Sequence, residues 1–78
     1  MWNQLSISVL ILLEDGDRTP KEIATLLDKP LATIEPLLEN HRKGGGRVRM
    51  RGKGPERAYS LTKKGRARLE WHRSQSGA

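Results

Sequence analysis

The sequence lacks several residue types that would support common functions. It has no cysteine and no phenylalanine, and its 78 residues include only two histidines, two tryptophans and one tyrosine. Without cysteine the chain can form neither a disulfide nor a thiolate metal site, and two histidines alone do not predict a structural zinc site. No apolar run approaches the roughly 20 residues of a transmembrane helix. The first four residues lack the basic start of a signal peptide, so we expect a cytoplasmic protein.

Recognisable catalytic motifs are also missing. His41 and His72 have no evident acidic partner, and no Ser/His/Asp set or pair of catalytic carboxylates can be identified. The glycine run at 44–46 lacks the Lys-Ser/Thr that completes a phosphate-binding loop, so we interpret it as a hinge. We therefore expect no enzyme, no cofactor and no metal, and we predict that each histidine packs at a helix end.

Charge is distributed unevenly along the chain. Residues 1–40 carry three basic and seven acidic side chains, a net charge of −4, whereas residues 41–78 carry twelve basic and two acidic ones, a net charge of +10. Positive charge concentrated in one half is typical of proteins that bind a polyanion. A solvated basic surface is the alternative. We favour a polyanion, because the charge lies in a segment with a regular strand pattern and not in a tail.

The segment Arg47 to Leu61 predicts a β-hairpin. Arginine alternates with apolar residues, a Gly/Pro turn follows from Gly52 to Glu56, and a second alternating run completes the segment. Strand side chains alternate between two faces, so one face is predicted to join the core. The residues assigned to this apolar face are Val48, Met50, Tyr59 and Leu61. The residues assigned to the opposite, exposed face are Arg47, Arg49 and Arg51.

Three helices are predicted before the hairpin, over residues 3–14, 20–27 and 31–41. Thr19 is predicted to cap the second helix and to form a capping box with Glu22. Asp28 must then tolerate a tight turn where glycine is easier. Pro36 leaves two alternatives open: a third helix that begins near Leu31 and contains the proline, or one capped at Thr33 with the proline in its first turn.

A fourth helix is predicted after the hairpin, from Thr62 to about His72. Thr62 is its expected N-cap, and Gly65 and Leu69 lie on one side of it with Leu61. Residues 74–78 are polar and predicted to form a disordered tail. The chain is therefore predicted to be one domain over residues 1–73.

This order of elements resembles the winged helix–turn–helix fold of small prokaryotic transcription regulators. The stretch VLILLEDGDRTPKEIATLL is similar to the family's first two helices, including its Thr-Pro-x-Glu-Ile-Ala start. The segment from Tyr59 to Gly65 resembles the Tyr-x-Leu-Thr-x-x-Gly end of the wing in regulators of the multiple-antibiotic-resistance and PadR types. The resemblance covers residues 5–72. It implies an α+β fold, with a three-helix core, a β-hairpin wing and a C-terminal helix, and a role as a DNA-binding transcription regulator.

The candidate nucleic-acid contacts follow from the charge pattern and from this resemblance. The basic candidates are Arg42, Lys43, Arg47, Arg49, Arg51, Lys53, Arg57, Lys63 and Lys64. In the family the third helix usually reads the major groove, and its outward residues here are predicted to include Thr33, Pro36 and Asn40. Asparagine suits a base contact, but Glu35 and Glu39 beside it would repel phosphates. We therefore predict that the arginine-rich wing dominates binding to double-stranded DNA.

Two other partners fit parts of the sequence. RNA could bind the same wing, although readers of single strands use exposed aromatic residues and the chain has only Trp2, Tyr59 and Trp71. A protein partner could bind the acidic third helix at Glu35 and Glu39, which would make the domain an adaptor.

The oligomeric state is open between monomer and homodimer. The first and last helices carry apolar residues that the main core does not use, namely Trp2, Ile7, Ile11, Ala67 and Trp71. These could pack together within one chain or form a dimer interface. We favour packing within the chain, because so small a domain has few other ways to bury a tryptophan.

Overall fold

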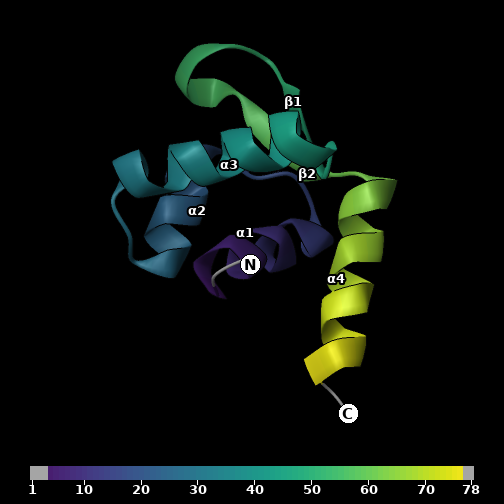
Figure 1. Cartoon of the computed structure of the whole chain (residues 1–78). Coiled ribbons are helices and arrows are strands. Elements are labelled where there is room, and N and C mark those ends of the chain that lie inside the picture. The colour runs from purple at the N-terminus through teal and green to yellow at the C-terminus, as the bar shows by residue number, and fades with distance from the viewer. Residues whose placement is uncertain (1–3, 77–78) are drawn as a thin grey trace.

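The structure is a computed structural model that describes residues 4–76. Its helices are α1 (Gln4–Leu12), α2 (Pro20–Leu27), α3 (Leu31–Gly45) and α4 (Lys63–Ser76), and its strands are β1 (Val48–Arg51) and β2 (Ala58–Leu61). Short 3-10 turns cover Leu13–Asp15 and Gly54–Glu56. Four helices with an antiparallel hairpin between the third and fourth confirm the predicted α+β architecture (Figure 1).

The core lies between the first three helices and is closed by the hairpin and by α4. It contains side chains from all four helices, both strands and the first 3-10 turn: Val9, Leu10, Leu13, Ile23, Ala24, Ile34, Leu38, Val48, Tyr59 and Leu69. Tyr59 is only 2% exposed, which confirms its predicted place inside. Its backbone also exchanges two hydrogen bonds with Arg18, of 2.8 and 3.1 Å, so β2 is held between β1 and the segment before α2.

The turns around α2 form as predicted. Thr19 Oγ1 accepts a hydrogen bond from the Glu22 backbone N–H at 3.2 Å, and Glu22 accepts one from the Thr19 N–H at 2.8 Å. This reciprocal capping box satisfies two N–H groups that the first helical turn leaves unpaired. Asp28 ends the helix in the left-handed region, with φ of 54°, so it does occupy the tight turn between α2 and α3.

The third helix is longer than predicted. It begins at Leu31 with Pro30 as its N-cap, so Pro36 lies inside it and the alternative start at Thr33 is wrong. It continues through Gly44 and Gly45 and ends at Gly46, which has φ of 61°. Two of the three glycines are therefore helical, and only the third makes the turn that we expected the whole run to make.

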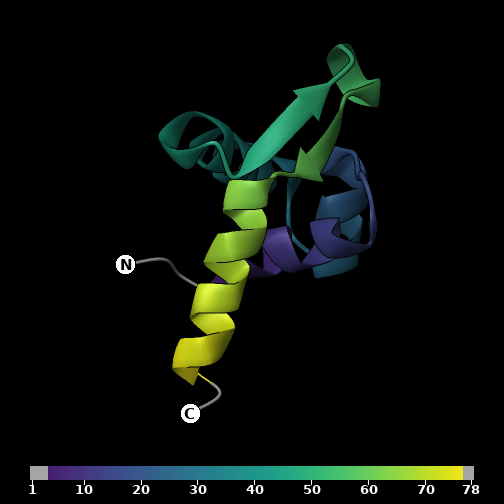
Figure 2. The same cartoon turned by 90° about the vertical axis from the view of Figure 1, so that its right-hand side faces the viewer.

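The hairpin register places Val48 opposite Leu61, Arg49 opposite Ser60, Met50 opposite Tyr59 and Arg51 opposite Ala58. Two predictions about its faces are wrong. Met50 lies on the apolar face but is 38% exposed, because the hairpin rises away from the helices toward its tip (Figure 2). Arg47 precedes β1 and does not share the face of Arg49 and Arg51. We refer to residues 48–61 as the wing.

The last helix begins as predicted and ends later. Thr62 caps it, accepting a hydrogen bond from the Gly65 N–H at 3.2 Å. Gly65 is buried against the hairpin, where an added Cβ would collide with the Arg47 carbonyl oxygen. The helix runs to Ser76, beyond the predicted end near His72. Of the predicted tail, residues 77 and 78 lie outside the described residues.

Candidate nucleic-acid interface

The outer face of the wing carries two exposed arginines. Arg49 and Arg51 lie opposite the small residues Ser60 and Ala58, so no large neighbour covers their guanidinium groups. Arg51 approaches Asp17 at 3.9 Å, but both side chains are largely exposed, and such a long surface pair holds an arginine only weakly. This face can therefore present two guanidinium groups to an anionic partner.

Further lysines border the same face. Lys53 is exposed in the turn of the wing, and Lys63 and Lys64 are exposed at the start of α4. A shallow groove of about 520 Å³ separates the wing from α4. Its lining residues are Gly46, Arg49, Ser60, Leu61, Thr62, Lys63 and Lys64. The structure thus brings Arg49 together with two lysines that are distant from it in the sequence.

Arg47 is turned inward instead. Its Nε donates a hydrogen bond to Nδ1 of His41 at 2.9 Å, and a terminal guanidinium nitrogen lies 3.4 Å from the Asn40 carbonyl oxygen. The guanidinium packs on Gly45, where a Cβ would collide with it. Burial, and secondarily the charge of Arg68, lower the pKa of Arg47. Arg47 therefore completes the C-terminal end of α3.

His41 is buried at that end, which confirms the predicted packing role. Because Nδ1 accepts from Arg47, the neutral ring carries its proton on Nε2, which lies 3.0 Å from both the carbonyl oxygen and the hydroxyl of Ser6 in α1. Burial lowers the pKa of His41; the Ser6 carbonyl opposes this change, and the nearby charge of Arg47 adds to it. The imidazole links α1, α3 and the start of the wing.

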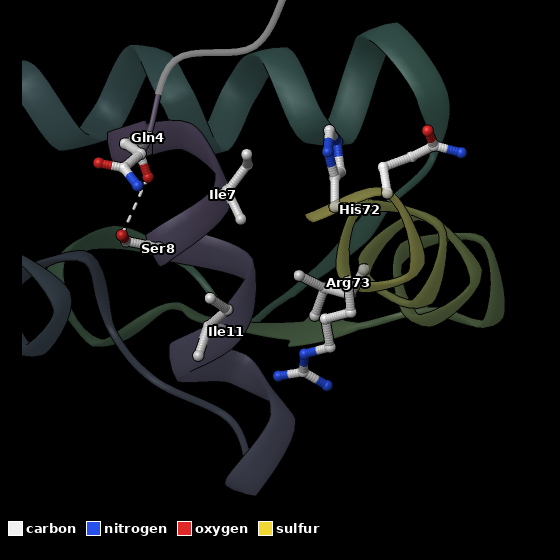
Figure 3. A pocket seen from close by; sticks show the side chains of 8 residues that line it. Gln4, Ile7, Ser8, Ile11, His72 and Arg73 are labelled. Carbon is white, nitrogen blue, oxygen red and sulfur yellow. Dashed lines mark hydrogen bonds between the residues drawn. The ribbon is translucent and has the colours of Figure 1, made fainter. Parts of the chain in front are cut away.

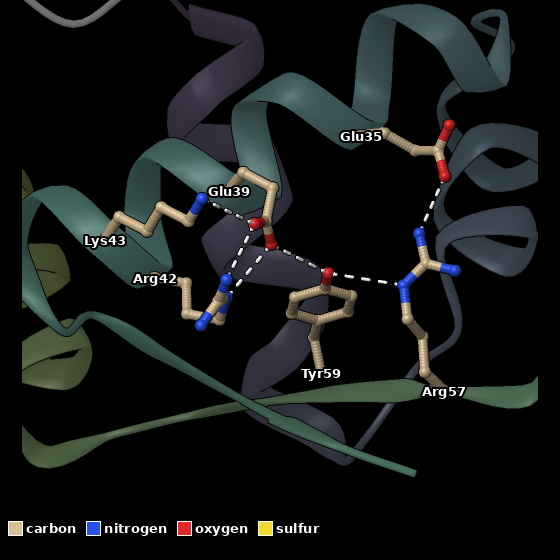
Figure 4. Close-up of polar contacts among 6 residues, drawn as sticks. All are labelled: Glu35, Glu39, Arg42, Lys43, Arg57 and Tyr59. Carbon is tan, nitrogen blue, oxygen red and sulfur yellow. Dashed lines mark hydrogen bonds and ion pairs between the residues drawn. The ribbon is translucent and has the colours of Figure 1, made fainter. Parts of the chain in front are cut away.

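Five residues form a polar network between the wing and α3, which we call the wing–helix network: Glu35, Glu39, Arg42, Arg57 and Tyr59 (Figure 4). Arg57 donates to Glu35 at 2.7 Å and lies 3.4 Å from the Tyr59 hydroxyl. The Tyr59 hydroxyl donates to Glu39 at 3.1 Å. Arg42 donates two hydrogen bonds to Glu39, at 2.8 and 3.0 Å. Three of the predicted basic contacts, Arg42, Arg47 and Arg57, are thus engaged within the protein.

The same network changes the interpretation of the glutamates. The hydrogen bonds from Arg42, with a smaller contribution from Tyr59, lower the pKa of Glu39 from 4.5 to about 2. Lys43 adds a longer ion pair to the same carboxylate at 3.7 Å. Because the charges of Glu35 and Glu39 are matched by arginines, the repulsion of phosphates that we expected from this helix is largely offset.

The exposed side of α3 matches the prediction. Thr33, Pro36 and Asn40 are all exposed, while Ile34, Leu38 and His41 face the core. The helix therefore presents a narrow surface with one hydroxyl and one amide, and its nearest exposed cation is Lys43. The spacing of Glu39 to Arg42 and Lys43 could have revealed their pairing from the sequence. Nothing in the sequence signals the contact of Glu35 with Arg57.

A second surface feature is an apolar groove between α1 and α4, of about 430 Å³ (Figure 3). Ile7 and Ile11 border it on α1, and Leu69, His72 and Arg73 border it on α4. Ile11 is 42% exposed and Trp71 is 50% exposed. The favoured prediction, that the first and last helices bury these residues within one chain, is therefore wrong for this pair; Trp2 lies outside the described residues.

Over residues 4–76, no group of three or more histidine, aspartate or glutamate side chains comes together as a metal ion would require. None of the described helices is long and apolar enough to cross a membrane.

Comparison with known proteins identifies the fold. No protein-family model matches the chain, and no curated protein sequence matches it. Solved structures do match. The solution structure of the homodimeric winged helix–turn–helix DNA-binding domain of a possible ArsR-family regulator from Mycobacterium bovis is 28% identical, with a TM-score of 0.76, and the alignment covers 96% of this chain and 68% of that one. A crystal structure of a possible transcriptional regulatory protein from the same organism is 26% identical, with a TM-score of 0.83 and coverage of 97% and 82%.

A more distant match extends the comparison to PadR. Bacillus subtilis PadR in complex with operator DNA is 22% identical, with a TM-score of 0.70, and the alignment covers 88% of this chain and 46% of that one. These proteins are described as regulators or as domains of regulators, and not as enzymes. Because the matches to the Mycobacterium bovis structures extend over nearly all of this chain, its four helices and hairpin form a winged helix–turn–helix domain of the kind found in prokaryotic transcription regulators.

Proposed function

We propose that this protein binds double-stranded DNA as the DNA-binding part of a transcription regulator, with the wing as its main contact. The observation that supports this most is the outer face of the wing, where Arg49 and Arg51 stand exposed beside small residues. Guanidinium groups placed in this way can bind phosphates or enter a minor groove narrowed by A·T-rich sequence. Acting on DNA would place the protein in the cytoplasm of a prokaryotic cell.

The structural neighbours support the same assignment. The Mycobacterium bovis domain is described as DNA-binding, and PadR was solved on operator DNA. In this chain the proposed contacts divide into two groups. The phosphate-facing group is Arg49, Arg51, Lys53, Lys63 and Lys64. The groove-facing group on α3 is Thr33 and Asn40, beside Lys43. Arg42, Arg47 and Arg57, which the sequence also suggested, are proposed to support the interface from within.

A titration of duplex DNA at several salt concentrations tests this proposal. Each phosphate that a lysine or arginine neutralises releases counterions, so the logarithm of the binding constant should fall by about 0.9 per contact for each tenfold rise in salt. With five such cations at the interface, we expect a slope of about −3 to −5. Binding that does not change with salt, or no binding at low salt, would contradict the proposal.

A chemical-shift map recorded during the same titration locates the interface. We expect the largest shifts at Arg49, Arg51 and the first turn of α4, with smaller shifts at Asn40. Structured RNA should compete poorly, since Tyr59 is buried and among the described residues only Trp71 offers an exposed aromatic ring. Equal competition by RNA would favour the RNA alternative.

The adaptor alternative has less support than the sequence suggested. It depended on an acidic surface at Glu35 and Glu39, and both carboxylates are now paired with arginines. The exposed side of α3 is therefore nearly neutral, and it offers little charge to a basic protein partner.

We also propose that the domain acts as a homodimer through the groove between α1 and α4. The groove contains the apolar side chains of Ile7, Ile11 and Leu69, and Ile11 is 42% exposed there, which a second copy of the same helices would cover. The Mycobacterium bovis domain with the same fold is described as homodimeric.

Analytical ultracentrifugation over a range of concentrations tests the dimer. Ile11→Asp should raise the dimer dissociation constant by about tenfold or more, because it places a charge in an apolar interface. Leu26→Asp is the matched control, since Leu26 is 54% exposed on α2, away from the groove. A protein that stays monomeric, or two variants with equal effects, would contradict the proposed interface.

A further inference from the structure

The wing is attached to α3 at two points that lie at different heights along the hairpin. At the level of Met50, the Tyr59 hydroxyl donates to Glu39 at 3.1 Å. Closer to the turn, Arg57 donates to Glu35 at 2.7 Å (Figure 4). It also donates to the Gly54 carbonyl oxygen at 2.8 Å. Arg57 thereby connects the turn itself to the helix.

The two glutamates share one side of α3. Residues four apart on a helix face the same way, so Glu35 and Glu39 form a short row that runs along the helix beside the hairpin. One attachment point would let the wing pivot about its base. Two points on a rigid helix fix the direction of the wing as well as its position.

Little else holds the outer half of the wing. Met50, Arg51 and residues 52–56 are exposed, and among the described residues the core contacts of the hairpin come from Val48, Tyr59 and Leu61. Backbone hydrogen bonds with Arg18 fix the other edge of β2, on the side away from β1. Among the described residues, the wing–helix network supplies the side-chain hydrogen bonds that join the hairpin directly to α3.

We propose that the wing–helix network sets this angle so that Arg49 and Arg51 reach the DNA backbone while Thr33 and Asn40 face a groove. Glu35, Glu39, Tyr59 and Arg57 are then positioning residues, which raise DNA affinity without touching DNA. The physical reason is pre-organisation: a wing already held at the binding angle loses less conformational freedom when the complex forms. This inference deepens the proposed DNA-binding function and rests on it.

Glu35 and Glu39 could instead weaken DNA binding, and this alternative predicts a change in DNA affinity of the opposite sign. If Glu35 and Glu39 mainly sequester arginines or repel phosphates, removal of either charge should strengthen DNA binding. If they position the wing, removal should weaken binding despite the more favourable net charge. The sign of the change in affinity therefore separates the two roles.

The matched comparison uses Glu35→Gln, Tyr59→Phe and Glu14→Gln. Glu14, in the 3-10 turn that follows α1, pairs with Arg73 of α4, so Glu14→Gln removes the same charge and a similar ion pair without touching the network. The probe is a DNA duplex with an A·T-rich centre, and binding is followed by fluorescence anisotropy at several salt concentrations. Amide hydrogen exchange in residues 48–61 of each variant reports how firmly the wing is held.

We expect Glu35→Gln and Tyr59→Phe to weaken binding by about fivefold each. Glu14→Gln should bind as tightly as the unmodified chain or slightly more tightly. The salt slope should stay the same in all three, because no phosphate contact is removed. Wing amides should exchange faster only in the two network variants, whereas a general loss of stability would accelerate exchange in the helices as well.

Affinities of Glu35→Gln and Tyr59→Phe equal to or above that of Glu14→Gln would overturn the inference. Failure of the proposed function would be distinguishable, since the unmodified chain would then not bind the duplex at low salt. In that case the exchange data still decide the structural part: wing amides as well protected in Glu35→Gln as in the unmodified chain would overturn it.

Discussion

The two faces of the wing differ in the environment of their arginines. On the outer face, Arg49 and Arg51 lie beside serine and alanine and extend into solvent. On the inner side, Arg57 is held by Glu35 and the Tyr59 hydroxyl, and just before the wing Arg47 is held by His41. An arginine contributes to DNA binding only if its guanidinium can leave its intramolecular partners, so the two groups should respond differently to substitution.

The same difference shows that the net charge overstates the positive charge available to a partner. The second half of the chain has a net charge of +10, but part of that charge is matched by carboxylates of the first half, at Glu14, Glu35 and Glu39. What remains unmatched lies mainly on the outer face of the wing and at the start of α4. Pairing between the halves thus concentrates the available positive charge on one surface.

The largest expected effect comes from removing the outer arginines. Arg49→Ala with Arg51→Ala should weaken duplex binding by about tenfold or more and make the salt slope shallower by about two, since two phosphate contacts are lost. The fold should persist, because neither side chain is in the core. Lys21→Ala with Lys29→Ala removes the same charge from exposed positions outside the proposed interface and should cost much less. Equal losses in both pairs would mean that net charge alone drives binding.

Removing the inner arginine at position 47 should affect stability more than the salt dependence of binding. Arg47→Ala deletes the hydrogen bond to Nδ1 of buried His41, which should lower the free energy of unfolding by about 1 kcal/mol. The pKa of His41 should rise, because the Arg47 charge helps to lower it. Denaturant unfolding and an NMR pH titration of the imidazole measure the two effects. A salt slope as shallow as that of Arg49→Ala would show that Arg47 reaches a phosphate.

Stability should also decrease in acid, in two stages. The folded protein lowers the pKa of His41 below 6.5, so the unfolded chain binds the extra proton first and the free energy of unfolding falls as pH drops below about 6.5. Glu39 acts at lower pH: its folded pKa of about 2 lies below 4.5, so its contribution is lost between about pH 4.5 and 2. His41→Gln should remove the first stage but leave the second, whereas His72→Gln should retain both. Unfolding curves across pH check this order.

The smallest effect is expected at the exposed side of α3. Thr33→Ala removes one exposed hydroxyl and should change duplex affinity by less than about twofold. Anisotropy measurements under the conditions used for the wing variants allow a direct comparison. If Thr33→Ala abolished binding while the double arginine change had no effect, α3 and not the wing would be the main DNA contact.

Local patterns in the sequence were sufficient to predict the elements and their order. The Thr19 capping box, the left-handed Asp28 and the Thr62 cap all depend on residues within a few positions of each other, and each formed as expected. The two strands also formed, although Met50 is exposed and Arg47 lies outside β1. Helix ends were less predictable. The helix continues through Gly44 and Gly45, and the missing side chain of Gly45 leaves room for the Arg47 guanidinium to pack against α3. This contact depends on the direction in which the following strand leaves the helix.

The sequence by itself determined the fold class, the burial of Tyr59, the outward face of α3 and the location of positive charge in the second half. Only the tertiary structure decided which lysines and arginines remain exposed and can contact DNA. Glu35 and Arg57 are 22 residues apart, and Ser6 and His41 are 35 residues apart, so neither pairing follows a helical or strand period. Helix caps and side-chain periodicity involve residues that are close in the sequence, so both can be recognised from the sequence alone. Whether a charge is exposed or paired depends instead on the packing of the wing against α3, which brings distant carboxylates and guanidinium groups within hydrogen-bonding distance.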